Sequence, residues 1–269
     1  MPELPEVEAV VRKLRKSAVG ARIAALHVFR PRATHPQSPS LVEAAVGRTI
    51  EAFDRRGKHI VVRLDNGLSL HVHLQLSGNL TVIPDARLHT NTVRALFTLT
   101  GGAGLALVDP RVLAFVNLLS DRALEEKLSR IGVDPLSKGF TPDFLAEASR
   151  GRGKPAKIFL MDQHPIAGLG NIYSAEALFR ARIHPATPVG KLRRPKLDLL
   201  HGGIRTVLEE AIPAAVRSYK DPGVHDGMHY FVYGREGEAC RICGHPVKRM
   251  EQNGRSTYFC AVCQRRTAL

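Results

Sequence analysis

The chain has 269 residues, 44% of them hydrophobic, which suits two domains or one large domain with a packed core. Its 39 lysines and arginines outweigh 25 acidic residues, and the net charge of +14 favours a polyanionic partner. A membrane is the alternative, but no apolar run approaches the roughly 18 residues of a membrane span, and the acidic start is unlike a signal segment. We therefore expect a soluble intracellular protein.

The first eight residues combine a helix start with a candidate nucleophile. If the initiator methionine is removed, Pro2 becomes the amino terminus, and an α-amino group titrates near pH ~8. A secondary amine that attacks an aldehyde gives an iminium, which draws electrons from neighbouring bonds. Glu3 and Glu6 place carboxyl groups within reach for acid–base chemistry. Pro5 followed by acidic residues is also ordinary helix-start chemistry, so these residues alone leave both interpretations open.

The first 120 residues predict a β-sandwich that carries one N-terminal helix. Apolar residues at helical spacing predict an amphipathic helix that begins at Pro5 and ends at Gly20. Short β-branched or aliphatic stretches then predict strands at 22–29, 49–56, 59–65, 68–76, 93–100 and 105–108. The Asp-Asn-Gly at 65–67 favours a hairpin, and the proline-bounded segment 31–39 is predicted to be a loop.

From residue 121 the pattern becomes helical. We expect helices at 121–131, after Thr141, at 157–162, at 172–182 and at 195–219. Residues 220–228 form a polar loop, and 230–233 begin a strand-like tail.

All four cysteines lie in the last thirty residues and predict a metal site. Two C-x2-C pairs, Cys240 with Cys243 and Cys260 with Cys263, have the spacing of a structural four-thiolate zinc site. A redox pair or free thiols are the alternative. With four ligands the site is closed, so one Zn²⁺ holds shape and performs no catalysis. A zinc-pinned basic hairpin can present Arg255, near its tip, to a phosphate.

Two glycine-containing stretches are candidate anion sites. The Gly-Leu-Gly turn at 168–170 precedes a helix that begins near Asn171, and such turns let backbone N–H groups approach a phosphate. The basic stretch at 150–154, which ends at Lys154, lies nearby in the chain. An ordinary helix start and a solvated loop are the more frequent explanations.

Lys58 lies in the Arg-Arg-Gly-Lys-His turn at 55–59, between two predicted strands, and this turn is a candidate phosphate clamp. His71 and His73 share one face of the next strand. For them we favour packing or hydrogen bonding over a second metal site.

Together these motifs resemble the formamidopyrimidine-DNA glycosylase/endonuclease VIII family of base-excision repair enzymes, nearly from end to end. The matching segments are Pro-Glu-Leu-Pro-Glu at 2–6, Arg-Gly-Lys at 56–58, His-Leu-Gln-Leu-Ser-Gly at 73–78, Asp-Pro-Arg at 109–111, Gly-Leu-Gly-Asn-Ile-Tyr at 168–173, Tyr-Gly-Arg-Glu-Gly-Glu at 233–238, and the four-cysteine finger with Arg255.

The resemblance implies an α+β multi-domain fold. Its parts are a catalytic β-sandwich with a leading helix (1–120), a DNA-binding helix–two-turn–helix domain (121–232) and a zinc finger (233–269). It implies that Pro2 attacks C1′ of the damaged nucleotide, that Glu3 is the acid–base partner and that Glu6 helps organise the site. Lys58 and Arg255 complete the catalytic set by holding phosphates.

The implied DNA contacts comprise these two cations and six further residues. They are Lys58, Leu76, Arg111, Leu113, Lys154, Asn171, Tyr173 and Arg255. Where the family fills the gap left by the flipped base with Met, Arg and Phe, this chain has Leu76, Arg111 and Leu113. The segment 220–230, which matches the loop that closes over the base, lacks the usual glycine-aromatic pattern. Purine lesions such as formamidopyrimidine, 8-oxoguanine and hydantoins are therefore only slightly favoured, with oxidised pyrimidines as the alternative.

The expected partner is damaged double-stranded DNA, bound by a monomer in the bacterial cytoplasm at the nucleoid. Two alternatives stay open: a non-catalytic DNA-binding protein on the same scaffold, and a zinc-ribbon RNA-binding protein. The acidic start argues against both, and 6% aromatic residues offer few stacking platforms for RNA.

Overall fold

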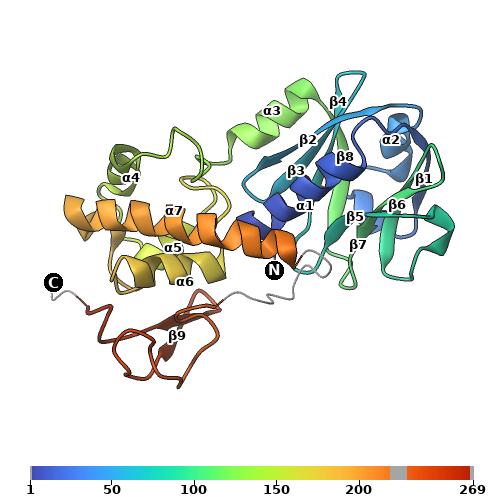
Figure 1. Cartoon of the computed structure of the whole chain (residues 1–269). Helices are drawn as coiled ribbons and strands as arrows, with labels where there is room; N and C mark the ends of the chain where they lie inside the picture. The colour runs from blue at the N-terminus through green and yellow to red at the C-terminus, as the bar shows by residue number, and fades with distance from the viewer. Residues whose placement is uncertain (1, 219–228, 267–269) are drawn as a thin grey trace. The chain divides into compact units, whose positions relative to one another are not determined.

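The computed structural model describes residues 2–218 and 229–266 (Figure 1). They divide into two compact units. The first comprises Met1–Arg130 with Ile212–Asp226, and the second Ile131–Ala211 with Gly227–Leu269. No helix in these described ranges is long and apolar enough to span a bilayer.

The first unit is a sandwich of two antiparallel four-stranded sheets, as its alternating strands predict. One sheet has the order β1 (Ile23–Val28), β6 (Val93–Leu99), β7 (Gly104–Val108) and β5 (Asn79–Ile83). The other has the order β2 (Ile50–Arg56), β3 (His59–Leu64), β4 (Leu68–His73) and β8 (Phe115–Ser120). Side chains from both sheets form one shared apolar core.

Helix α1 (Leu4–Ser17) completes that core. Val7, Val10, Val11 and Leu14 repeat at helical spacing and are fully buried in it. The helix packs against β2 and β3 of one sheet and β5 of the other. The predicted N-terminal helix is therefore confirmed, and it is an integral part of the sandwich.

Several short elements differ from the sequence predictions. The segment 31–39, predicted to be a loop, contains a 3₁₀ turn at Pro31–Thr34 and leads into α2 (Pro39–Val42), since proline fits a first helical turn. Two further 3₁₀ turns lie at Glu43–Ala45 and Ala86–Leu88, and α3 spans Asp121–Ser129. The strand predicted at 68–76 ends at His73, because residues 74–78 close a turn in which the Gly78 N–H donates to the Leu74 carbonyl at 2.8 Å.

The second unit contains the finger and the predicted helices other than α3, which belongs to the first unit. Its elements are α4 (Pro142–Ser149), α5 (Ala156–Met161), α6 (Asn171–Arg180), a 3₁₀ turn at Val189–Lys191, the start of α7 (Arg194–Arg217), β9 (Lys248–Gln252) and β10 (Arg255–Phe259). The strand-like start predicted at 230–233 is wrong. The buried carboxylate of Glu176 accepts the backbone N–H groups of Phe231, Val232 and Tyr233 at 2.9 Å each, and successive N–H groups of a strand point to opposite sides.

Candidate functional site

The N-terminal carboxylates lie in a capped and buried helix start. Pro2 is buried, and Glu3 and Glu6 are 1% and 8% exposed. The Glu6 carboxylate accepts the Glu3 N–H at 2.8 Å, as half of a capping box with Glu3 as the N-cap. This arrangement fixes the backbone beside Pro2 and places an acidic side chain next to it, as a terminal-amine mechanism needs.

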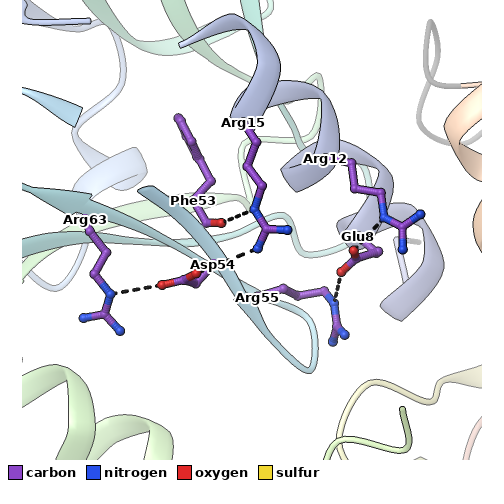
Figure 2. Close-up of polar contacts among 7 residues, drawn as sticks. All are labelled: Glu8, Arg12, Arg15, Phe53, Asp54, Arg55 and Arg63. Carbon is purple, nitrogen blue, oxygen red and sulfur yellow. Dashed lines mark hydrogen bonds and ion pairs between the residues drawn. The ribbon is translucent and has the colours of Figure 1, made fainter. Parts of the chain in front are cut away.

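Two arginines fasten α1 to β2, as Figure 2 shows. Arg15 Nε donates to the Phe53 carbonyl at 2.7 Å, and Arg55 Nε donates to Glu8 at 2.8 Å. Arg12 Nε also donates to Glu8, at 2.8 Å. Burial raises the pKa of Glu8, but the hydrogen bonds from Arg55 and Arg12 outweigh it and leave that pKa below its ordinary value. Glu8 is therefore an anion that holds the helix to the sheet.

Lys58 lies in a tight turn between β2 and β3. Arg56 and His59 pair across the turn, and Gly57 has a φ of +56°, which glycine adopts without strain. Nδ1 of His59 lies 2.8 Å from Nε2 of His71, and His73 Nδ1 accepts the Gln75 N–H at 3.0 Å. The histidines thus serve in hydrogen bonding and packing, as the sequence favoured.

The three residues expected to fill the gap in the duplex lie on two adjacent turns. Leu76 is on the turn after β4, while Arg111 and Leu113 are on the turn before β8. Ser77 Oγ on the first turn donates to an Asp109 carboxylate oxygen on the second at 2.5 Å. The turns are thereby joined side by side, with Arg111 exposed and the two leucines partly exposed.

Asp109 organises the second of these turns. Its carboxylate is fully buried and accepts the backbone N–H groups of Arg111, Leu113 and Ala114 at 3.0, 2.5 and 2.7 Å. Gln75 and Val112, one on each turn, have φ values of +54° and +56°. Non-glycine residues in this region carry strain that concentrates at functional sites.

The Gly78 position requires glycine. A Cβ atom there would lie 2.4 Å from the Leu74 carbonyl oxygen and 2.6 Å from the Ala114 Cβ. Any larger residue would push the two turns apart, so the Ser-Gly of this motif is explained by close backbone approach.

In the second unit, a lysine that the sequence analysis missed joins two predicted phosphate contacts. Lys157 on α5 is completely buried. Its Nζ donates to Asn171 Oδ1 at 2.6 Å, to the Ser256 carbonyl at 3.0 Å and to Thr257 Oγ1 at 2.7 Å. Since Ser256 follows Arg255, this one ammonium group links the start of α6 to the arginine-bearing hairpin. A lysine inside the apolar run 156–160 was the available signal.

The remaining contacts predicted here differ in exposure. The Gln163 side chain holds the glycine turn by accepting the Gly168 N–H at 2.9 Å and donating to the Leu169 carbonyl at 2.8 Å. Tyr173 is fully buried, so a DNA contact would have to use its backbone at the helix start. Lys154 is half exposed and pairs with Asp162 at 3.1 Å.

The finger places Arg255 as predicted and brings the four cysteines together. Arg255 is exposed and directly follows the Asn-Gly turn between β9 and β10. All four Sγ atoms lie within 4.8 Å of one another. Four thiolates about 2.3 Å from one tetrahedral zinc lie about 3.8 Å apart. The distances of 3.4 Å for Cys243–Cys260 and 3.9 Å for Cys240–Cys263 fit that geometry.

The predicted site residues therefore fall into two groups. The first unit holds Pro2, Glu3, Glu6, Lys58, Leu76, Arg111 and Leu113. The second unit holds Lys154, Asn171, Tyr173, Arg255 and the four cysteines. Most of the segment 220–230, expected to close over the base, lies outside the described residues.

Three family models match the chain in succession. They are the formamidopyrimidine-DNA glycosylase N-terminal domain at residues 1–116, the formamidopyrimidine-DNA glycosylase H2TH domain at 131–221, and the zinc finger found in FPG and IleRS at 237–266. The zinc finger match and the cysteine geometry both assign one structural Zn²⁺ to the four thiolates.

Relatives of known name match over nearly the whole chain. The formamidopyrimidine-DNA glycosylase of Gluconobacter oxydans is 41% identical, covering 98% of this chain and all of that protein. That of Chloroflexus aurantiacus is 40% identical, covering 98% of each.

Solved structures also match nearly the whole chain. The Lactococcus lactis Fpg in complex with abasic-site DNA superposes with a TM-score of 0.91 at 30% identity, covering 98% of this chain and all of that one. The wild-type Lactococcus lactis Fpg bound to N7-benzyl-Fapy-dG DNA gives 0.90 at 32% identity with the same coverage. With sandwich, helical part and finger all matched, the chain belongs to the formamidopyrimidine-DNA glycosylase family.

Proposed function

We propose that this protein is a base-excision repair DNA glycosylase with AP lyase activity, and that Pro2 is its nucleophile. The observation that carries the proposal is the buried acidic start, in which Glu3 caps α1 beside Pro2. It gains weight from relatives named formamidopyrimidine-DNA glycosylase that are about 40% identical over 98% or more of the chain.

The chemistry follows from a secondary amine. The Pro2 nitrogen attacks C1′ and loses its proton while the glycosidic bond breaks, and the base leaves with the electron pair of that bond and takes up a proton. Glu3 gives a proton to the sugar ring oxygen as the ring opens, and a positively charged iminium forms. The iminium makes the C2′ proton acidic, so the 3′ phosphate leaves by β-elimination and the 5′ phosphate by a following δ-elimination. The Glu6 carboxylate holds Glu3 in place by accepting the Glu3 N–H.

DNA binding uses the groups that the sequence singled out. Lys58, Asn171 and Arg255 hold phosphates near the lesion, with Lys154 and the Tyr173 backbone as further contacts. C1′ is shielded in a duplex stack, so the damaged nucleotide is flipped out. Leu76, Arg111 and Leu113 then fill the gap, and the joined turns that carry them support this role.

The substrate class is a ring-opened or oxidised purine. Fapy-dG complexes among the structural relatives support this preference, because those proteins share the fold and about 30% of the sequence. Oxidised pyrimidines are the competing class, since two leucines replace the larger gap-filling residues.

We further propose that residues 1–120, 121–232 and 233–269 are the catalytic, helical and finger parts of a monomer. It acts at the nucleoid in the bacterial cytoplasm. Sedimentation of the protein with and without DNA tests the monomer, because a dimer would double the sedimenting mass.

Borohydride trapping tests the function. The protein, with removal of Met1 verified by mass, is incubated with duplexes that carry 8-oxoguanine, a formamidopyrimidine, a hydantoin, thymine glycol or an abasic site. A reduced adduct that maps to Pro2 is expected, with purine lesions ranked first. Tight binding without an adduct on any duplex would instead identify a non-catalytic damaged-DNA-binding protein.

A further inference from the structure

Two arginines connect α1 to β2, but only one of them also reaches the Lys58 turn. Arg15 Nε donates to the Phe53 carbonyl at 2.7 Å, in the middle of β2. Arg55 Nε donates to Glu8 on α1 at 2.8 Å (Figure 2). Its Nη1 donates to the Gly57 carbonyl at 3.1 Å. One guanidinium group thus bonds both to the helix that begins beside Pro2 and to the residue directly before Lys58.

This connection is shielded from water. The side chains of Arg55 and Glu8 are 9% and 13% exposed, whereas Arg12, which also bonds Glu8, is 50% exposed. The attraction within a buried ion pair offsets the cost of removing its charges from water only when the geometry is good and the remaining N–H donors have acceptors. The planar fork of arginine can direct two N–H groups to two different acceptors, which the single ammonium group of lysine does less well.

The path from amine to phosphate contact is short and rigid. Glu8 lies in the first two turns of α1, whose N-cap Glu3 adjoins Pro2. The Gly57 carbonyl belongs to a two-residue turn closed by paired strands. The Arg55 side chain connects these two rigid elements, and its two directional hydrogen bonds fix the orientation of the guanidinium group.

We infer that Arg55 is a positioning residue, which sets the place of the Pro2 amine relative to the phosphate held by Lys58. The inference rests on the proposed function, because it concerns the same attack on C1′. Orientation of a nucleophile against a bound substrate governs the rate of the chemical step more than the affinity. Loss of Arg55 should therefore slow adduct formation on DNA that is already bound.

The test measures single-turnover borohydride trapping on an abasic duplex at saturating enzyme, together with Kd for the same duplex. Arg55→Gln should slow trapping by about tenfold or more, while Kd changes by less than about threefold. The matched control is Arg15→Gln, which removes an α1–β2 bond distant from the turn; its trapping rate should stay within about twofold of the wild type.

A second pair of measurements separates positioning from folding. The double variant Glu8→Leu with Arg55→Met removes both buried charges, so its thermal stability should return close to that of the wild type. Its trapping rate should nevertheless stay as slow as that of Arg55→Gln. In a further set of duplexes, a neutral methylphosphonate replaces each phosphate flanking the lesion in turn. At the phosphate that Lys58 contacts, this replacement should slow trapping by the wild type. It should slow Arg55→Gln much less, because its amine is no longer aligned to that phosphate.

The outcomes are distinguishable. If the wild type forms no adduct on any duplex, the proposed function fails and this inference fails with it. If the wild type is normal while Arg55→Gln and the double variant trap at its rate, the inference alone is overturned. A rate loss in Arg15→Gln equal to that in Arg55→Gln would also overturn it, since any loosening of α1 would then suffice.

Discussion

Two buried cations, Arg55 in the first unit and Lys157 in the second, each join elements that carry predicted DNA contacts. Arg55 connects the helix beside Pro2 to the Lys58 turn. Lys157 connects Asn171 to the hairpin that begins at Arg255. Both units thus use an interior cation to fix surface groups that are distant in sequence.

The two cations differ in what they bond. Arg55 bonds an anion, so removing it leaves the Glu8 carboxylate buried and short of a partner. Lys157 donates to three uncharged oxygens, so removing it leaves these acceptors unsatisfied. None of the three is a carboxylate that would be left charged without its partner. Arg55 should act on the chemical step, because it positions the proposed nucleophile, and Lys157 on affinity, because it positions the proposed phosphate contacts.

The variant with the largest expected effect breaks the connection made by Lys157 and leaves the one made by Arg55 intact. Cys260→Ser should cost the finger its zinc and unfold the hairpin, because a structural zinc site folds around its ion. DNA affinity should fall on the order of a hundredfold. Hydrogen exchange should show lost protection in β9, β10 and α5, with α1 and β2 unchanged. Normal binding to damaged duplex by this variant would show that the finger does not hold DNA.

Lys157→Met should lower DNA affinity by about tenfold, while trapping at saturating enzyme stays close to the wild-type rate. This is the reverse of the pattern expected for Arg55. The matched control is Lys196→Met, since Lys196 Nζ also donates to two carbonyls of this unit, those of Ala181 and Arg182 at 3.5 and 3.2 Å, and neither carbonyl belongs to the finger. A Lys157 variant with wild-type Kd, or one no weaker than the control, would refute the link.

The sequence predicted what depends on local patterns. The cysteine spacing gave the finger and a hairpin with Arg255 near its tip, and the helical repeat of apolar residues gave α1. Strands β5 and β8 were missed although they are as long as β7 and β1, which were predicted. Their pairing with β7 and β4 does not follow the order of the chain. Pairing of that kind leaves little local signal.

The side chains that organise the site were harder to predict. Arg55 occurs in a stretch rich in basic residues, where a solvated cation is the usual outcome. For Lys157 the only signal was its place in the apolar run 156–160. The burial of both cations depends on acceptors as much as 100 positions away, as for Lys157 and Thr257. The error at 230–233 has the same origin, because Glu176 lies more than 50 positions before the N–H groups it binds.

Within the first unit, Asp109→Asn tests an anion held by backbone N–H groups instead of an arginine. An amide has one acceptor oxygen where the carboxylate has two, so the turn with Arg111 and Leu113 should loosen. We expect a loss of about 2 kcal/mol in the free energy of unfolding. Asp85→Asn, which removes an ion pair with exposed Arg87, should change the free energy of unfolding much less in the same urea titration. Equal losses in the two variants would contradict the role of Asp109.

The smallest expected effect is a dependence of stability on pH that originates near the Lys58 turn. Burial lowers the pKa of His59 to about 2, of His71 to about 3 and of His73 to about 4. Each folded-state pKa lies below the ordinary value of 6.5, so the unfolded chain binds more protons between these limits. The stability is therefore fully present above about pH 6.5 and is lost progressively as the pH falls towards the folded-state pKa values.

His71→Val removes one of these groups, so its free energy of unfolding should fall less steeply between pH 6.5 and pH 5, by about 1 kcal/mol per pH unit. Urea titrations at several pH values measure this slope. The exposed His89, in the connection between β5 and β6, supplies the control, and His89→Val should keep the wild-type slope. If His71→Val kept it too, protonation of the unfolded histidines would not be the source of the acid sensitivity, and the three rings would have to accept protons inside the fold.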